Sequence, residues 1–207
     1  VKLAEEALQQ AIDANPDALD LKAQLASVYF ATERYDQAMR VVGEVLAQDG
    51  ENVLALLTRG RIRVVRGETD AAIADLNRVL ELSKQNVDAR LALAAAYRQR
   101  NNWDAAIRQL EEAVSIQPLN KVLRQQLVDM YASAQPSPRW LEAQRLVDET
   151  RQMPQFQNDP DWAAAAARLW RRRGVTENAL AAIADARRLS GDDTLLMDEY
   201  LQVLLNA

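Results

Sequence analysis

The side chains that could do acid–base chemistry in this chain are carboxylates that stand next to one another. Adjacent pairs occur at Glu5-Glu6, Glu111-Glu112 and Asp192-Asp193. Neighbours on a helix point in different directions, so these pairs are typical of a solvated surface. The chain has no histidine and no cysteine, which removes an imidazole base, a thiolate nucleophile and the usual zinc ligands. We expect no catalytic residue, no cofactor and no metal, and therefore no enzyme.

The densest basic feature is the run Trp170-Arg171-Arg172-Arg173-Gly174. It could form an anion-binding patch. Cations just before a glycine are also typical of a helix C-terminus, where they complement the helix dipole. We favour this second interpretation.

Composition limits the class of protein further. The chain has 207 residues, of which 49% are hydrophobic and 5% aromatic, and its net charge is −5. This is enough apolar material for a folded core, whereas a nucleic-acid binder would need a basic surface. No apolar run reaches membrane-spanning length, so we expect no direct membrane insertion.

The first residue is Val1 and not methionine, which suggests a processed or excised chain whose targeting signal lies in the missing part. We expect a soluble protein, cytoplasmic or periplasmic, whose compartment the sequence leaves unknown.

A repeat organises the whole chain. Alanine recurs with a constant spacing of 34 at Ala4, Ala38, Ala72 and Ala106, and similar text surrounds each later copy, as in Trp103-Asp104-Ala105-Ala106-Ile107. The series continues at Ala143 and Ala179 with spacings of 37 and 36. A period of this length predicts a helical-repeat fold.

Apolar residues spaced three and four apart predict two amphipathic helices in each repeat. The first helices are predicted at Leu19–Thr32, Val53–Arg66, Val87–Arg100, Lys121–Ser133 and Asp161–Arg173. The second helices are predicted at Asp36–Gln48, Asp70–Leu82, Asp104–Ile116, Trp140–Gln152 and Glu177–Leu189, with a leading helix at Lys2–Ala14 and a trailing one at Thr194–Leu205. The predicted single array comprises a half-unit 1–18, complete units 19–52, 53–86, 87–120, 121–159 and 160–193, and a half-unit 194–207.

This repeat pattern resembles the tetratricopeptide repeat family along essentially the whole chain. An aromatic residue stands late in several first helices, as Tyr29 and Tyr97 do, small residues such as Ala26 and Gly60 stand at the helix crossing, and Pro118 closes a unit. The resemblance implies an all-α fold, a right-handed α-α superhelix or solenoid of stacked antiparallel helix pairs. It also implies a concave wall of first helices on which peptides or partner helices lie.

The sequence departs from this pattern in two places. Arg59 and Arg63 stand where leucine and an aromatic residue are usual, so we expect this hairpin to pack less tightly. The segments 135–138 and 153–160 add prolines around the fourth unit. They predict either a bend in the array, a binding feature found in this unit alone, or surface loops that tolerate insertions. We favour the surface loops.

The residues expected to face inward form the predicted partner-binding groove. They are Ala23, Ser27, Phe30, Leu54, Leu57, Arg61, Val64, Leu91, Ala95, Arg98, Gln125, Asp129, Ala164, Arg168 and Arg171. The early part of this wall is apolar with scattered arginines, and the later part is polar and then basic. Such a surface suits a protein or peptide with apolar anchors and acidic residues, because arginine pairs carboxylates bidentately. The alternative is that these residues are half-buried neighbours of the helix packing.

The leading functional prediction is a non-catalytic scaffold that binds a peptide or protein partner in the concave groove. A self-assembly module is the alternative, with homo-oligomers formed through apolar stripes on the terminal half-units, such as Leu3/Ala7/Leu8/Ala11 and Leu196/Leu201/Leu204/Leu205. A further alternative is a targeting module of a larger enzyme or cell-envelope export machine.

Overall fold

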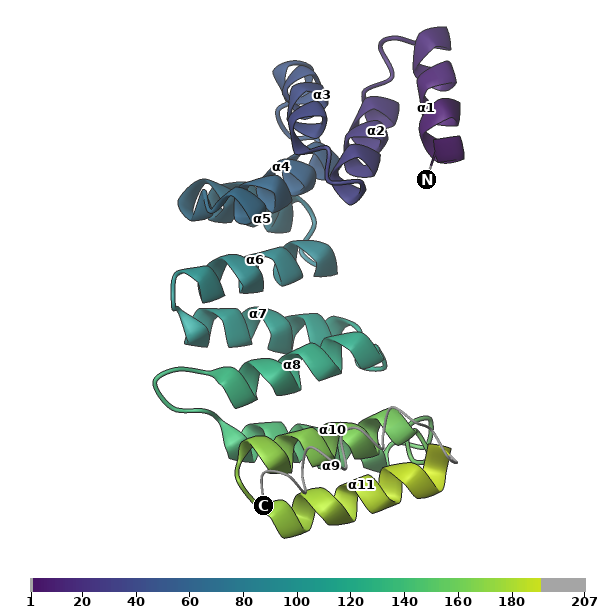
Figure 1. Cartoon of the computed structure of the whole chain (residues 1–207). Coiled ribbons are helices and arrows are strands. Elements are labelled where there is room, and N and C mark those ends of the chain that lie inside the picture. The colour runs from purple at the N-terminus through teal and green to yellow at the C-terminus, as the bar shows by residue number, and fades with distance from the viewer. Residues whose placement is uncertain (1, 191–207) are drawn as a thin grey trace. The chain divides into compact units, whose positions relative to one another are not determined.

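The computed structural model describes residues 2–190, and every regular element in that range is an α-helix (Figure 1). The helices are α1 (Lys2–Ala14), α2 (Leu19–Ala31), α3 (Tyr35–Gln48), α4 (Val53–Arg66), α5 (Thr69–Leu82), α6 (Val87–Gln99), α7 (Trp103–Ile116), α8 (Lys121–Ser133), α9 (Trp140–Gln152), α10 (Pro160–Arg172) and α11 (Thr176–Ser190). Their bounds agree with the predicted ones to within one residue. The trailing helix predicted at Thr194–Leu205 lies outside the described residues.

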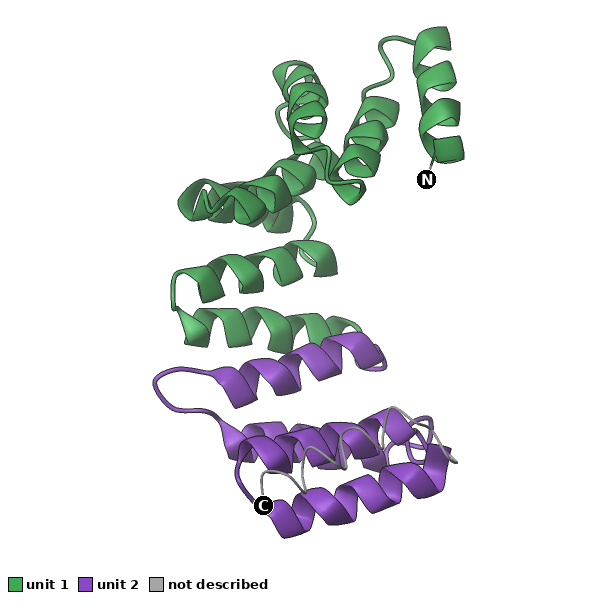
Figure 2. Cartoon of the chain, in the orientation of Figure 1, with its two compact units in different colours: residues 1–117 green, residues 118–207 purple. Residues whose placement is uncertain are grey.

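The chain divides into two compact units with the boundary between Gln117 and Pro118 (Figure 2). Unit 1 contains α1 to α7, and unit 2 contains α8 to α11. Within each unit the helices form pairs that stand side by side, such as α4 with α5 and α10 with α11. The predicted division into five complete repeats between two half-units stays a proposal.

Asparagine caps begin several of the helices. The side chain of Asn52 accepts a hydrogen bond from the backbone N–H of Ala55, and Asn86 accepts one from Ala89. In unit 2, Asn120 caps α8 in the same way. Each of these asparagines follows the previous one by a single repeat period, so the repeat encodes helix starts as well as packing positions.

The turn inside a helix pair uses a left-handed residue. Gly67 and Gly174 have φ of 75° and 77°, which confirms the prediction that they end helices where only glycine enters this conformation without cost. Glu33 and Asn101 stand one repeat period before and after Gly67 and have φ of 60° and 58°. The backbone geometry of the turn therefore recurs even where the residue is not glycine.

Small residues bring paired helices close together. The repeated alanines Ala38, Ala72, Ala106, Ala143 and Ala179 are completely buried. Ala4, the first of the series, is exposed on α1. A Cβ added to Gly60 would lie 2.8 Å from both Cγ and Cδ2 of Leu76, so α4 approaches α5 as closely as their side chains allow.

The expectation of loose packing between α4 and α5 is wrong. Arg59 binds Asp75 through two hydrogen bonds, Nε to Oδ2 at 2.9 Å and Nη2 to Oδ1 at 2.7 Å. Arg63 Nη1 also donates to Asp75 Oδ2 at 2.7 Å. The two arginines that replace apolar residues thus surround a buried carboxylate, and this pairing joins the helices beside their apolar contacts.

The additions around the fourth unit include a core residue. Phe156 lies in the loop between α9 and α10, is 8% exposed, and packs edge-on against the fully buried Trp162 with ring centroids 6.1 Å apart. The favoured prediction of a tolerated surface loop is therefore wrong for this part of the insertion, which packs into unit 2. None of the helices between residues 2 and 190 combines the length and apolarity needed to cross a membrane.

Candidate partner-binding surfaces

A hollow of about 250 Å³ opens on unit 1 over the first helices α2, α4 and α6. Its lining is mostly apolar, with one basic and one acidic side chain: Phe30, Arg61, Val64, Val65, Asp88, Leu91, Ala92 and Ala95. Phe30, Arg61, Val64, Leu91 and Ala95 belong to the groove predicted from the sequence. The structure therefore brings residues from three consecutive repeats to one concave place, named the unit 1 hollow below.

Arg61 lies against an aromatic ring in this hollow. Its guanidinium carbon is 4.3 Å from the centroid of the Phe30 ring, which is a cation–π distance. Phe30 in turn contacts Tyr35, with ring centroids 5.7 Å apart. This contact holds the guanidinium over the ring, and the N–H groups of Arg61 remain able to donate.

Most half-buried arginines of unit 1 already hold a carboxylate. Arg34 binds both carboxylate oxygens of Glu5 at 2.8 and 2.6 Å, Arg59 and Arg63 share Asp75, and Arg90 lies 3.0 Å from Glu112. Arg61 has no hydrogen-bond acceptor among residues 2–190, and its recorded partner is the Phe30 ring. Its donors are therefore free for a ligand.

Two of the predicted groove residues of unit 1 lie in the protein core and outside the lining of the hollow. Ala23 is completely buried beside Ala26, Val42 and Ala55, and Leu57 is 5% exposed in the next cluster of the core. Their side chains contact neighbouring helices and cannot present themselves to a ligand, so we remove them from the proposed surface. The packing interpretation holds for both, because a position on the inner helix can point between helices as well as into the groove.

The other predicted groove residues of unit 1 stand outside the lining of the hollow. Ser27 and Leu54 are half-buried, and Arg98 is exposed on α6. Val65, Asp88 and Ala92 line the hollow but were not predicted. For Asp88 a signal existed, because it stands one repeat period after Leu54 and therefore occupies the same inward register position.

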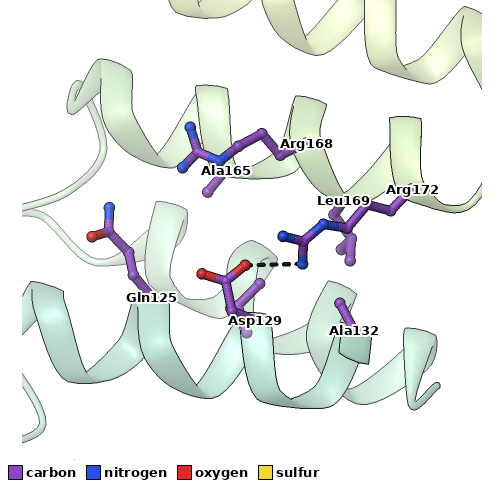
Figure 3. A pocket seen from close by; sticks show the side chains of 8 residues that line it. Gln125, Asp129, Ala132, Ala165, Arg168, Leu169 and Arg172 are labelled. Atoms are coloured by element: carbon purple, nitrogen blue, oxygen red, sulfur yellow. Dashed lines mark hydrogen bonds and ion pairs between the residues drawn. The ribbon is translucent and has the colours of Figure 1, made fainter. Parts of the chain in front are cut away.

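Unit 2 has a smaller and more polar hollow between α8 and α10 (Figure 3). Its volume is about 20 Å³, and Gln125, Asp129 and Arg168 of the predicted groove line it together with Arg172. Arg172 Nη1 lies 3.0 Å from Asp129 Oδ1, and this ion pair spans the opening in Figure 3. Arg171 is half-buried on α10 outside this lining, and Ala164 is 4% exposed in the core. The charges that are paired here are not free for a partner.

Several acidic groups of unit 2 are also held by cations. The hydrogen bond from Arg188 lowers the pKa of Asp185, burial opposes this shift, and Arg151 adds to it. Burial acts to lower the pKa of Lys121, but hydrogen bonds to Asp159 and Asp161 outweigh it and raise the pKa. Within residues 2–190, no three carboxylates, histidines or cysteines lie together as metal ligands would.

A family model described as tetratricopeptide repeat matches residues 1–60 and 66–128. The chain belongs to the tetratricopeptide repeat family, whose fold supports protein-interaction scaffolds and whose members are generally non-catalytic. The matched part ends within α8, shortly before the proline-containing additions.

Solved structures share this fold. YrrB, a tetratricopeptide protein with an unusual peptide-binding site, superposes with a TM-score of 0.66 at 18% identity and covers 94% of this chain and 97% of its own. A structure from the functional characterisation of pilF of Pseudomonas aeruginosa has a TM-score of 0.69 at 16% identity and covers 100% of this chain and 91% of its own. At these identities the likeness concerns the fold alone.

Among curated proteins, subunit 2-A of the ER membrane protein complex of Xenopus laevis is 31% identical over 100 residues. The match covers 48% of this chain and 34% of that protein. The chain therefore corresponds to about a third of this relative's length.

Proposed function

We propose that this chain is a non-catalytic scaffold that binds a peptide, or an exposed segment of a protein, in the unit 1 hollow. The observation that carries the proposal is the convergence of apolar side chains from α2, α4 and α6 around a stacked arginine with free donors. An apolar side chain of the partner would fill the hollow, and a carboxylate beside it would bind Arg61.

These two contacts alone give a weak affinity. Burying one Leu-sized side chain contributes roughly 1.5–3 kcal/mol. A charge-assisted hydrogen bond to arginine adds about 1.5–3 kcal/mol. Part of this gain offsets the entropy lost on association, so several such contacts along the first helices are needed for micromolar binding.

A random twelve-residue peptide display library, selected against the intact protein, provides the test. Two changes remove the proposed contacts without touching the core: Arg61→Gln and Leu91→Gln, both at half-buried positions of the lining. We expect the double variant to lose about tenfold or more in affinity for the selected peptides, measured by fluorescence anisotropy.

The matched control carries Arg40→Gln and Leu82→Gln, which change the same residue types at exposed positions of α3 and α5. It should bind as the wild type does, and circular dichroism should show all three proteins folded. If the selected peptides bind the double variant as tightly as the wild type, the unit 1 hollow is not the binding site and the proposal is wrong.

Self-association through α1 is the second candidate. On this helix Leu3 is 82% exposed, and Ala4 and Ala7 are also exposed, so an apolar stripe is free to contact a second copy. The corresponding stripe predicted beyond residue 190 lies outside the described residues. Sedimentation velocity over a concentration series tests this candidate. A concentration-dependent dimer that Leu3→Glu abolishes and Gln10→Glu preserves would support it, whereas a strict monomer at high concentration excludes it.

A further inference from the structure

The unit 1 hollow carries two charges of opposite sign that have no ion-pair partner among residues 2–190. Arg61 on α4 and Asp88 on α6 both belong to its lining, and no ion pair joins them. Asp88 lies in the first turn of α6 and has no cation or hydrogen-bond donor as partner among the described residues. Apolar residues complete the lining around these two charges.

This arrangement differs from that of the surrounding surface. Elsewhere in unit 1, two aspartates in the first turn of a second helix are neutralised from the next repeat: Asp36 by Arg66 at 2.5 Å and Asp70 by Arg100 at 2.8 Å. Asp88 begins a first helix and has no such cation among the described residues, and Arg61 lacks the carboxylate that its neighbours Arg59 and Arg63 share. Among the described residues of unit 1, the hollow is thus where an acid and a half-buried base, Asp88 and Arg61, both lack an ion pair and share an apolar lining.

Because the two opposite charges lie on different helices, the two ends of a bound peptide meet different charges. A peptide with a side chain in the apolar part lies beside a cation from α4 and an anion from α6. A partner with its charges in the matching order gains two attractions, and one with the reversed order suffers two repulsions. Charge complementarity of this kind sets the register and orientation of a partner more than its raw affinity.

We propose that the unit 1 hollow selects peptides by the order of their charges. The preferred segment has an apolar anchor, a carboxylate that binds Arg61 and a lysine or arginine that binds Asp88. This inference rests on the proposed peptide-binding function and adds the class of segment that is bound. It narrows the partner from a generally acidic peptide to one that carries both charges in a fixed order.

The test exchanges the two charges of the protein. Arg61→Glu combined with Asp88→Arg keeps the net charge and reverses the order of the two charges. A control exchange, Arg40→Glu combined with Asp17→Arg, reverses two charges outside the lining, neither of which has an ion-pair or hydrogen-bond partner for its side chain within residues 2–190. The probe is the random twelve-residue display library, selected separately against the wild type, the hollow exchange and the control exchange.

Peptides selected on the wild type should contain an apolar residue with an acid and a base in one preferred order, and peptides selected on the hollow exchange should show the opposite order. For one selected peptide and its charge-reversed copy, we expect reversal to weaken binding to the wild type about tenfold and the hollow exchange to restore it. The control exchange should behave as the wild type does.

Three outcomes would overturn the inference. If selected peptides depend on Leu91 but show no charge order, or the same order on both proteins, the hollow binds peptides without reading charge, and the proposed function stands alone. If no selected peptide depends on Leu91, the proposed function fails as well. If the wild type self-associates at micromolar concentration and the hollow exchange abolishes this, the occupant is a second copy of the chain and not a partner peptide.

Discussion

The hollows of the two units are built from equivalent first helices but differ in what they offer to a partner. The unit 1 hollow has about 250 Å³ and includes Arg61 and Asp88, whose charges have no ion-pair partner in the described part of the chain. The unit 2 hollow has about 20 Å³, and there Asp129 is bound by Arg172. The difference teaches that an inward position alone does not make a binding residue. A charged side chain on the inner helix is available only where the neighbouring helix does not already neutralise it.

The two units also differ in how deeply their ion pairs are buried, and this difference predicts the largest effect on stability. Asp75 in unit 1 has a side chain that is 7% exposed and is bound by two arginines, whereas the side chain of Asp129 in unit 2 is 63% exposed. We expect Asp75→Ala to lower the free energy of unfolding by about 3 kcal/mol, because two guanidinium groups lose their shared acceptor inside the hairpin. Urea denaturation measures this change.

Asp129→Ala is the matched change in unit 2 and should cost less than about 1 kcal/mol, as exposed pairs do. Equal losses for the two aspartates would contradict the comparison between a structural ion network and a surface one.

A second prediction concerns the loop insertion that only unit 2 has. Phe156→Ala should lower the free energy of unfolding by about 2–4 kcal/mol, because it removes a buried ring and the edge contact with Trp162. The control is Leu141→Ala on α9, where a side chain that is 70% exposed should contribute little. Thermal unfolding followed by tryptophan fluorescence measures the effect. If Phe156→Ala changes stability as little as Leu141→Ala does, the segment is a tolerated surface loop.

A smaller effect tests a feature that both units share. Gly67→Ala and Gly174→Ala should each destabilise by about 1 kcal/mol, because a Cβ is strained at positive φ. At the equivalent turn, Glu33→Gly should be neutral or stabilising by up to about 1 kcal/mol, since it relieves the same strain. Opposite signs for Gly67→Ala and Glu33→Gly in urea titrations are the expected result, and a loss of stability in both would show that Glu33 makes a contribution other than its backbone conformation.

The smallest effect is a dependence of unit 2 stability on pH. Arg188 and Arg151 lower the pKa of Asp185 in the folded state against the opposing effect of burial. A lowered pKa means that the ionised carboxylate stabilises the fold above the unfolded-state pKa, and that this contribution is lost as the pH falls through the folded-state pKa. Asp185→Asn should therefore lower stability by less than about 1 kcal/mol at neutral pH and leave it nearly unchanged in acid. Unfolding measured from neutral pH into the acid range checks the sign.

Much of the fold could be predicted from residue types and spacing because the interactions that define it are local. Helix starts follow Asn52 and Asn86, which cap the next turn of their own chain. α4 and α10 end just before Gly67 and Gly174, where glycine adopts the left-handed conformation at the lowest cost. The buried alanines recur at the period of the repeat because each one meets an equivalent neighbour.

The candidate site was only partly predictable, since a helical position faces several neighbours at once. Arg61 and Phe30 were expected in the groove and do line the unit 1 hollow. Leu57 was expected beside them and lies in the core, because its place on α4 points between helices. Asp88 was not predicted, although the repeat places it in register with Leu54.

The sequence by itself determined the class of fold, the helix bounds and the family of this protein, because caps, turns and repeat spacing act over a few residues or over one constant period. Only the tertiary structure decided which inward charges remain unpaired. That outcome depends on contacts between residues on different helices, such as Asp129 with Arg172 and Arg59 with Asp75. Among the described residues, Arg61 and Asp88 have no such ion pair.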